Sequence, residues 1–259
     1  MKYTVLSLFP EITDAYFAAS IMAKAISRGI VEYRRVNVRD FAQNRHHSCD
    51  DAPYGGGAGM LMLPEPLGLA LESVGVKPCP VTGKAAGRQV IYLSPSGRPF
   101  TQALARELAG EAELVLICGR YEGIDQRIID LYVDDEISVG DYVLSSGEVA
   151  ALSLIDATYR LLNEVITPES LEEESFSGNL LEYPQYTRPE VYATLRVPEI
   201  LLSGHHENIR RWRRRNQVEK TLAVRPDLID RGVTLGLFDR ETGRFIEELR
   251  WKDERDKGD

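Results

Sequence analysis

Short apolar runs alternate with helical patterns over residues 1–160, and this alternation restricts the possible folds more than any other feature of the sequence. The runs at 3–9, 88–93, 113–118 and 136–139 are expected to be buried strands. Helical spacing of apolar residues follows each of them, at 12–29, at 100–108, from Ile124, and from Gly147 to about Leu162. Strands that alternate with helices in this way indicate an α/β domain with a mainly parallel sheet.

The composition of the chain changes after Leu162. Residues 167–174 contain one proline and four glutamates, which is typical of a linker or an exposed loop. From Gly178 the pattern is helical, and the tail 253–259 has four acids, two bases and no apolar residue, so fraying is expected there. We therefore predict a domain over 1–161, a mobile linker over 162–177 and a smaller helical domain over 178–259.

Composition also limits the function. The chain has 31 Lys and Arg against 40 Asp and Glu, a formal net charge of −9, which is the wrong sign for a protein that coats duplex DNA without selectivity. Three widely spaced cysteines (Cys49, Cys79 and Cys118) exclude a disulfide framework and a C-x-x-C zinc site, and they fit a reducing compartment. With neither a targeting segment nor a run of about 18 apolar residues, a soluble cytoplasmic protein without a membrane partner is expected.

Three loops that follow predicted strands mix glycine, small apolar residues and one or two charges: Leu93–Pro95, Gly119–Gly123 and Ser138–Leu144. In an open parallel sheet, the carboxyl ends of the strands meet at one edge, and ligands bind there. A single such loop is usually only a connection. Three at the same edge predict a site for a ligand with an apolar planar part and a charged tail.

A dense glycine cluster occupies Tyr54–Gly59. It matches neither dinucleotide-binding G-x-G-x-x-G, because Met62 stands at the last position, nor the Walker pattern, because no lysine follows. A plain surface turn is one interpretation. The interpretation we favour is a backbone surface that a flat ligand can approach closely.

A basic run extends from His205 to Lys220 and has a local net charge of +4 in an otherwise acidic chain. A solvated helix face is one interpretation of such a run. The arginines are contiguous, however, and enclose Trp212, and we expect them to lack the i,i+4 acidic partners of a solvated face. Contact with phosphates is therefore a competing interpretation.

Other kinds of site have little support. His46, His47, Cys49 and Asp50 include zinc-ligand types, but no further ligand stands at a typical spacing, so no metal site is predicted. The serine hydrolase motif G-x-S-x-G is absent. The missing dinucleotide fingerprint disfavours a nicotinamide-dependent dehydrogenase.

Eight segments, in order along the chain, resemble the bacterial tRNA (guanine-N1)-methyltransferases of the SPOUT class, and the resemblance covers residues 1–226. The resemblance implies a deep trefoil knot in the α/β domain, which is a rare exception to un-knotted folds. It also implies a homodimer whose active site lies between the subunits. The matching segments are Leu8-Phe9-Pro10, Asp50-Asp51-x-Pro53-Tyr54-Gly55-Gly56-Gly57-x-Gly59-Met60, Leu93–Pro95, Cys118–Asp125, Gly140–Leu144, Leu154–Ala157, Tyr186–Glu190 and Ser203–His206.

The family's cofactor is S-adenosylmethionine, held in a bent form by the knot loops. A magnesium ion assists in the family, but its ligands cannot be assigned in this sequence. By resemblance, the cofactor would contact Tyr92, Leu93, Ser94, Pro95, Gly119, Arg120, Tyr121, Glu122, Gly123, Ser138, Val139, Gly140, Asp141, Tyr142, Val143, Leu144, Ser146 and Gly147.

The family methylates N1 of the guanine at tRNA position 37, just 3′ of the anticodon. A base must remove the N1 proton, and an arginine stabilises the charge that spreads to O6. Arg160 matches the catalytic arginine, and Glu174 stands where the family has its general base. The target base must leave its stack, and the Tyr54 turn is suited to receive it. The expected RNA contacts are Tyr54, Gly55, Gly57, Gly59, Glu182, His205, His206, Arg210, Arg211, Arg213, Arg214 and Lys220.

The sequence departs from the family pattern at three positions. Glu174 replaces an aspartate before Ser175-Phe176, Ser146 replaces a glycine in the cofactor loop, and Ala58 replaces a proline in the glycine turn. Two alternatives stay open: a SPOUT methyltransferase that acts on another RNA, and a non-catalytic RNA-binding module with the same fold.

Overall fold

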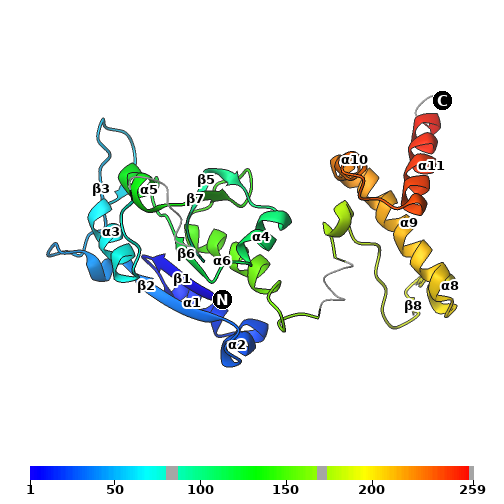
Figure 1. The fold of residues 1–259 in the computed structure, drawn as a ribbon, viewed down its shortest axis with the longest axis horizontal. Coiled ribbons are helices and arrows are strands. Elements are labelled where there is room, and N and C mark those ends of the chain that lie inside the picture. The colour runs from blue at the N-terminus through cyan, green and yellow to red at the C-terminus, as the bar shows by residue number, and fades with distance from the viewer. Residues whose placement is uncertain (80–86, 168–173, 257–259) are drawn as a thin grey trace. The chain divides into compact units, whose positions relative to one another are not determined.

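The computed structural model describes residues 1–79, 87–167 and 174–256, which form two compact units, Met1–Ile166 and Thr167–Asp259 (Figure 1). The boundary between the units lies within the range where the sequence predicts a linker. The middle of that range, residues 168–173, lies outside the described residues.

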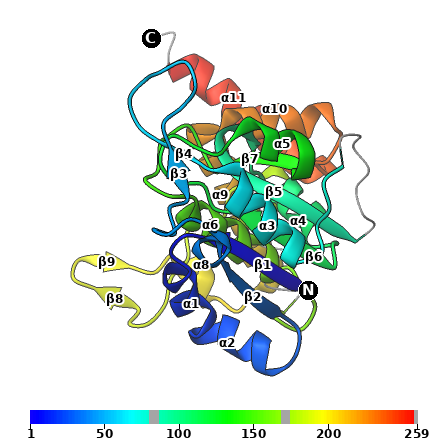
Figure 2. The ribbon, with the colours of Figure 1, turned by 90° about the vertical axis from the view of Figure 1, so that its left-hand side faces the viewer.

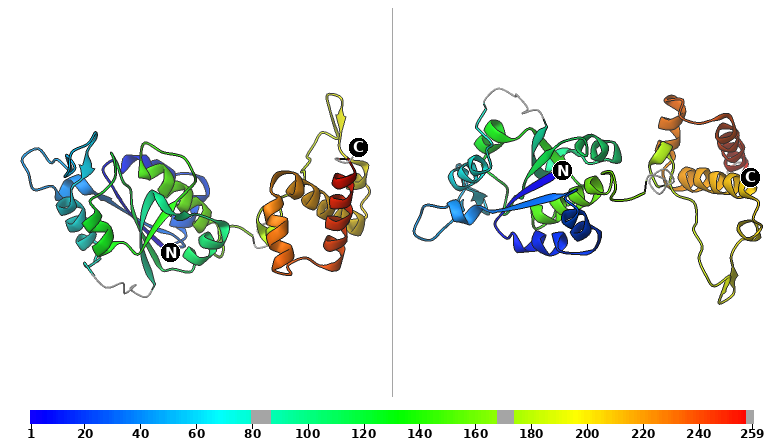
Figure 3. Two further views of the ribbon diagram at one scale, coloured as in Figure 1. Left: turned by 90° about the horizontal axis from the view of Figure 1, so that it is seen from above. Right: turned by 60° about the horizontal axis from the view of Figure 1, so that its bottom comes forward.

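The first unit contains a five-stranded parallel sheet with the strand order β2-β1-β6-β5-β7. This sheet confirms the predicted α/β class. The central strand β6 is buried along its whole length, because helices cover both faces of the sheet (Figures 2 and 3). The strands are β1 (Lys2–Ser7), β2 (Glu32–Asn37), β5 (Arg88–Pro99), β6 (Glu113–Ile117) and β7 (Asp135–Ser138).

Alternate residues of the strands pack in two separate hydrophobic cores, one on each face of the sheet, because successive side chains point to opposite faces. Leu114 and Leu116 pack on one face, with the helices α1 (Glu11–Phe17), α2 (Ser20–Ser27), α4 (Gln102–Leu108) and α6 (Gly147–Tyr159). Val115 and Ile117 pack on the other, with α3 (Pro64–Ser73), α5 (Gln126–Tyr132) and the 3₁₀ helix η1 (Val38–Phe41).

Two local expectations are wrong. The helix expected over 12–29 divides into α1 and α2, because the chain turns at Ala18–Ala19 and Ser20 has a positive φ of 51°. The strand expected over 88–93 does not end at the Leu93–Pro95 loop: β5 continues to Pro99, and its register against Ile137 shifts between Leu93 and Arg98. Residues 94–97 therefore form a bulge that stays within the sheet.

The second unit is mainly helical, with α8 (Glu199–Leu202), α9 (His206–Val224), α10 (Pro226–Thr234) and α11 (Arg240–Asp256). Its core joins Leu180, Val218, Ile229, Phe245 and Ile246. A short hairpin of β8 (Val191–Tyr192) and β9 (Leu195–Arg196) projects from it (Figure 3). The backbone is helical through Asp256, so fraying from residue 253 onward is not observed in the described part of the tail.

Two smaller elements complete the chain. The strands β3 (Asp50–Asp51) and β4 (Leu61–Met62) pair antiparallel on either side of the glycine cluster, and the short 3₁₀ helix η2 spans Ser177–Asn179. Among the described residues, there is no helix with the length and apolar character needed to span a bilayer.

Candidate cofactor pocket and arginine surface

A pocket lies at the carboxyl ends of β5, β6 and β7, where the sequence predicts a ligand site. All of the residues expected to contact the cofactor line it except Asp141. The structure adds Ile137, Ser145 and Ala150 to the lining. The three loops that were considered separately in the sequence are thus brought together around one cavity.

Glycine at position 147 allows the start of α6 to contact the loop after β6 in the wall of the pocket. The Gly147 amide donates a hydrogen bond of 2.9 Å to the Gly119 carbonyl. A Cβ on Gly147 would lie 2.7 Å from the Gly119 nitrogen and 2.8 Å from Cα of Cys118, so no larger residue fits without moving the backbone. Ser146, by contrast, has an extended φ of −162°, which any residue adopts. Its side chain in place of glycine therefore requires no unusual backbone conformation.

A buried carboxylate lies beneath the pocket. The Glu148 side chain is fully buried; it accepts a 2.5 Å hydrogen bond from the Ser7 hydroxyl and lies 3.3 Å from Nε of Arg120. The Arg120 guanidinium also stacks 4.6 Å from the centre of the Phe9 ring. These contacts fix the Arg120 side chain between β1, the loop after β6 and the start of α6. Sequence reasoning assigned no role to Ser7 or Glu148, although Ser7 precedes the matched segment Leu8-Phe9-Pro10 and Glu148 follows Gly147, an expected cofactor contact.

Two pocket-region groups have pKa values raised mainly by burial. The pKa of the Cys118 thiol is raised well above its usual value, with the negative charge of Glu148 adding to the effect. The fully buried Cys118 side chain packs in the core on the α6 side of the sheet. Burial, and then the charge of Glu136, raise the pKa of the Tyr92 hydroxyl.

The rim of the pocket is apolar and exposed. The exposed fraction is 86% for Val143 and 56% for Tyr142, and Leu144 and Tyr121 are also exposed. Apolar side chains grouped around a cavity mouth are typical of a surface that another molecule covers.

The glycine turn is attached to this pocket. Four of its residues, Gly55, Gly56, Gly57 and Gly59, have positive φ, while the Tyr54 side chain is fully exposed. The Glu122 amide donates to the carbonyl of Met60, and a Cβ on Gly59 would lie only 2.4 Å from Cγ of Glu122. The end of the turn therefore packs directly on the loop that lines the pocket.

Arg160 does not line the pocket of its own chain. It is the half-buried C-cap of α6, whose first residue, Gly147, lines the pocket. At about 1.5 Å per residue, the 13 residues of α6 separate the two ends by about 20 Å.

Glu174 begins a tight turn in the helical unit. The Ser175 amide donates to Oε1 of Glu182, and the Glu182 amide donates to the Ser175 hydroxyl. The turn is anchored because Leu180 is buried and the Leu181 amide donates to the Thr221 hydroxyl of α9. The Glu182 carboxylate thus shapes the Glu174 turn, whereas the sequence suggested an RNA contact.

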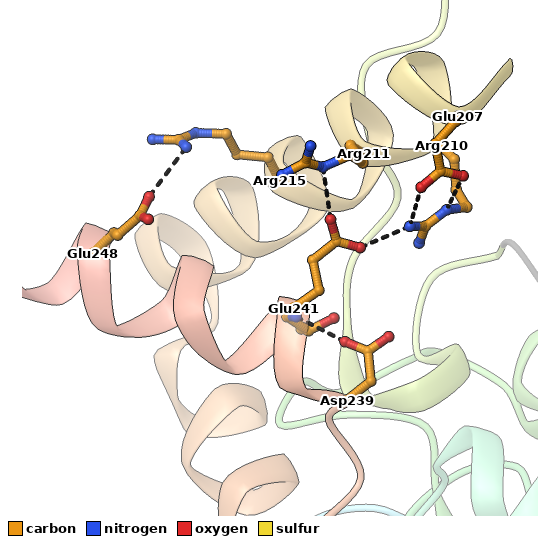
Figure 4. A network of polar contacts seen from close by, with 8 residues as sticks. Glu207, Arg210, Arg211, Arg215, Asp239, Glu241 and Glu248 are labelled. Atoms are coloured by element: carbon orange, nitrogen blue, oxygen red, sulfur yellow. Dashed lines mark hydrogen bonds and ion pairs between the residues drawn. The ribbon is translucent and has the colours of Figure 1, made fainter. Parts of the chain in front are cut away.

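The arginines of the basic run lie on α9, and Arg210, Arg211 and Arg215 have acidic partners (Figure 4). Arg210 pairs with Glu207 at 2.8 Å and with Glu241 of α11 at 2.7 Å, and these carboxylates raise its pKa. Glu241 also pairs with Arg211 at 2.7 Å. The expectation that the run lacks i,i+4 acidic partners is wrong, because Glu207 stands four residues before Arg211 and Glu219 four residues after Arg215. The ion pairs that form nevertheless follow other spacings: Glu207 pairs with Arg210 at i+3, and the remaining partners come from α11.

The other predicted RNA contacts of this unit lie along the same helix. His205 and His206 are exposed at the start of α9, and Lys220 is exposed near its end. Arg213 stacks 4.8 Å from the centre of the Tyr183 ring, and Arg214 is half-buried. A row of cationic side chains thus runs the length of α9.

Residues 1–231 match the sequence model of the family described as tRNA (Guanine-1)-methyltransferase TrmD. The chain belongs to this family. Curated relatives named tRNA (guanine-N(1)-)-methyltransferase include that of Treponema denticola, 60% identical over 249 residues (96% of this chain and 99% of the relative). The relative from Treponema pallidum is 54% identical over 252 residues (97% of each), and that from Borreliella burgdorferi is 58% identical over 230 residues (88% and 92%).

The TrmD family match ends at residue 231, so α11, which supplies Glu241, lies beyond it. No group of three or more His, Cys, Asp or Glu side chains that could hold a metal ion occurs among the residues that the structure describes. The arrangement therefore offers no preformed site for the magnesium ion that the resemblance implies, and no chemical step is assigned to it.

Proposed function

We propose that this TrmD family member transfers the methyl group of S-adenosylmethionine to N1 of guanine at tRNA position 37, immediately 3′ of the anticodon. Family membership over most of the chain carries the reaction class, because the curated relatives are named for guanine-N1 methylation of tRNA. Such a substrate makes the cytoplasm the proposed site of action.

The pocket suits S-adenosylmethionine in its chemistry. Its glycine-lined wall accepts a flat purine closely, the apolar side chains of Leu93, Val139 and Leu144 suit the faces of that ring, and Arg120 offers a fixed positive charge. When bound, the cofactor supplies an electrophilic methyl group on a sulfonium sulfur. The glycine turn on the pocket loop supports the proposal that the target guanine enters beside it.

Glu174 and Arg160 divide the chemistry of the guanine between them. The Glu174 carboxylate takes the N1 proton as N1 forms its bond to the methyl carbon and the bond from that carbon to sulfur breaks. Negative charge that develops on O6 is stabilised by the Arg160 guanidinium. Neither Glu174 nor Arg160 lines the pocket of its own chain. In this proposal, the binding of tRNA and of a second subunit brings both residues to the target guanine.

A homodimer satisfies that requirement. Arg160 stands about 20 Å along α6 from the pocket of its own chain, which supports its acting in the pocket of a second copy. The exposed apolar rim around Tyr142 and Val143 supports a partner surface at the same place.

The experiment that tests the function is methyl transfer from labelled S-adenosylmethionine to an unmodified tRNA transcript with guanosine 3′ of the anticodon. We expect 1-methylguanosine as the product nucleoside, and none with adenosine at that position. A different methylated nucleoside would favour another RNA substrate. Failure of the chain to bind S-adenosylmethionine by calorimetry would favour a non-catalytic RNA-binding module.

Mixing two inactive variants tests the shared active site. We expect Glu174→Gln and Arg120→Ala dimers to regain activity when their subunits exchange, because each mixed dimer then contains one site with both wild-type residues. At a 1:1 ratio with random exchange, about a quarter of the wild-type activity should return. The measurement is initial methylation rate before and after exchange, with exchange followed by a mass tag. If tagged dimers form and activity stays at the parental level, the site is not shared in this way.

A further inference from the structure

The contacts between α9 and α11 carry an inference about how the arginine surface takes a ligand. This surface is defined by Arg210, Arg211 and Arg215. Glu241 bridges the first two, with Oε2 at 2.7 Å from Nη2 of Arg210 and Oε1 at 2.7 Å from Nε of Arg211. Glu248, two turns further along α11, lies 3.2 Å from Nη1 of Arg215 (Figure 4).

Glu241 is held in place and does not swing freely. Its side chain is 27% exposed, compared with 69% for Glu207, which pairs with the same arginine. The start of α11 is capped by Asp239, whose carboxylate accepts a 2.7 Å hydrogen bond from the amide of Thr242. Thr242 itself is buried, and Phe245 packs in the core of the unit one turn later. The carboxylate is thus presented to α9 by a fixed helix end.

A carboxylate that bridges two guanidinium groups uses the N–H donors that a phosphodiester would use. A ligand phosphate that takes the same donors, on Nη2 of Arg210 and Nε of Arg211, must therefore displace the carboxylate. Contacts between exposed ions are weak in water, so this exchange is accessible. It also means that a phosphate gains less at these arginines than it would at unpaired ones.

We propose that Glu241 and Glu248 occupy two phosphate-binding positions on α9, and that RNA binds this surface by displacing them. The first position is formed by Arg210 and Arg211, and the second by Arg215. The identity of the RNA partner rests on the proposed function. The new element is the role of α11, which lies outside the family match and supplies carboxylates that compete with the RNA phosphates. The carboxylates of Glu241 and Glu248 lower the affinity of α9 for any phosphodiester chain. They also make that affinity depend less steeply on salt concentration.

The test is the affinity of the full-length Glu241→Gln protein for a single-stranded oligouridylate and for the tRNA transcript, measured from 50 to 300 mM salt by fluorescence anisotropy. Glutamine keeps the shape of the side chain but removes its charge. We expect oligouridylate to bind about 3- to 10-fold more tightly at low salt. The slope of log affinity against log salt should steepen by about 0.7 for each phosphate contact that no longer competes with a carboxylate.

Glu247→Gln is the matched control, because Glu247 is an exposed acid of the same helix and makes no ion pair with any described residue. It changes the net charge equally, so it should leave affinity within about twofold. Glu248→Gln should give a smaller gain than Glu241→Gln, since among the described residues Glu248 pairs with one arginine and Glu241 with two.

Arg211→Ala separates this inference from the proposed RNA role of α9. If Arg211→Ala weakens RNA binding while Glu241→Gln behaves like Glu247→Gln, the competitor role is overturned and RNA binding by α9 stands. Weaker binding of Glu241→Gln, with an unchanged melting temperature, would also overturn it, because the carboxylate would then be positioning the arginines. If Arg211→Ala changes nothing, the RNA role of this surface itself is wrong.

Discussion

Glu174→Gln is expected to lower the rate constant of methyl transfer by about 10²- to 10⁴-fold, which is the contribution typical of a general base. Glutamine preserves the size and polarity of the side chain but cannot accept the N1 proton. Because the residue belongs to the helical unit and not to the pocket lining, affinity for S-adenosylmethionine should be unchanged. The measurement is single-turnover methylation at saturating tRNA, so that chemistry and not product release limits the rate.

Two further variants show whether the loss of activity comes from the missing carboxylate. Glu174→Asp should retain much of the activity, because it restores a carboxylate and the turn closed by Ser175 and Glu182 can shift by the missing methylene. Glu199→Gln, an exposed acid of the same unit, should turn over as the wild type does. Turnover of Glu174→Gln within threefold of wild type, under the same conditions, would rule out Glu174 as the base.

Local sequence patterns predicted that these loops would line one pocket, because a parallel sheet gathers strand ends at one edge. Gly119 and Gly140 follow β6 and β7, and Leu93 lies near the end of the buried part of β5, so the parallel sheet brings these distant residues together. The distance of Arg160 from the pocket could also be predicted from the sequence, because the number of residues in the helix sets the distance between its two ends. The pairing of Ser7 with Glu148 was not, because it joins residues 141 positions apart.

Two of the longer elements escaped prediction, for different reasons. Strand β2 lies at the edge of the sheet and buries only Val36, so Glu32–Asn37 contains no apolar run. Helix α3 contains Pro64, Pro66 and Gly68, which usually indicate a turn. Pro64 is tolerated because it stands at the first helical position, where no amide donor is needed.

The arginine partners on α11 could not be found from spacing along the sequence. The i,i+4 rule concerns one helix, whereas Glu241 reaches Arg211 from a helix that begins 29 residues later. Only the packing of α9 and α11 around Phe245 and Val218 reveals that a run with a local charge of +4 is partly neutralised. A basic run therefore predicts where phosphates are attracted, but not what they must displace.

Gly147→Ala is expected to abolish detectable binding of S-adenosylmethionine, with a loss of at least about 100-fold in affinity, and to lower the free energy of unfolding by about 1–3 kcal/mol. The added Cβ would meet the Gly119 nitrogen at 2.7 Å and the Cα and carbonyl carbon of Cys118 at 2.8 and 3.0 Å. All three are backbone atoms, and Cys118 is fully buried, so no flexible side chain can move aside. The start of α6 must instead move away from the loop after β6, which breaks the hydrogen bond between the Gly147 amide and the Gly119 carbonyl.

Gly243→Ala provides the matched control for this substitution. Gly243 lies within α11, and a Cβ there would meet no atom within 4 Å. Alanine in a helix interior is favoured over glycine, so this variant should be more stable by about 0.5–1 kcal/mol and should bind the cofactor normally. Calorimetric titration and urea unfolding of both variants measure the two effects. If Gly147→Ala binds S-adenosylmethionine within threefold of the wild type, the close contact between α6 and the loop after β6 is not what shapes the pocket. If only its unfolding free energy falls, the contact stabilises the fold but does not form the cofactor site.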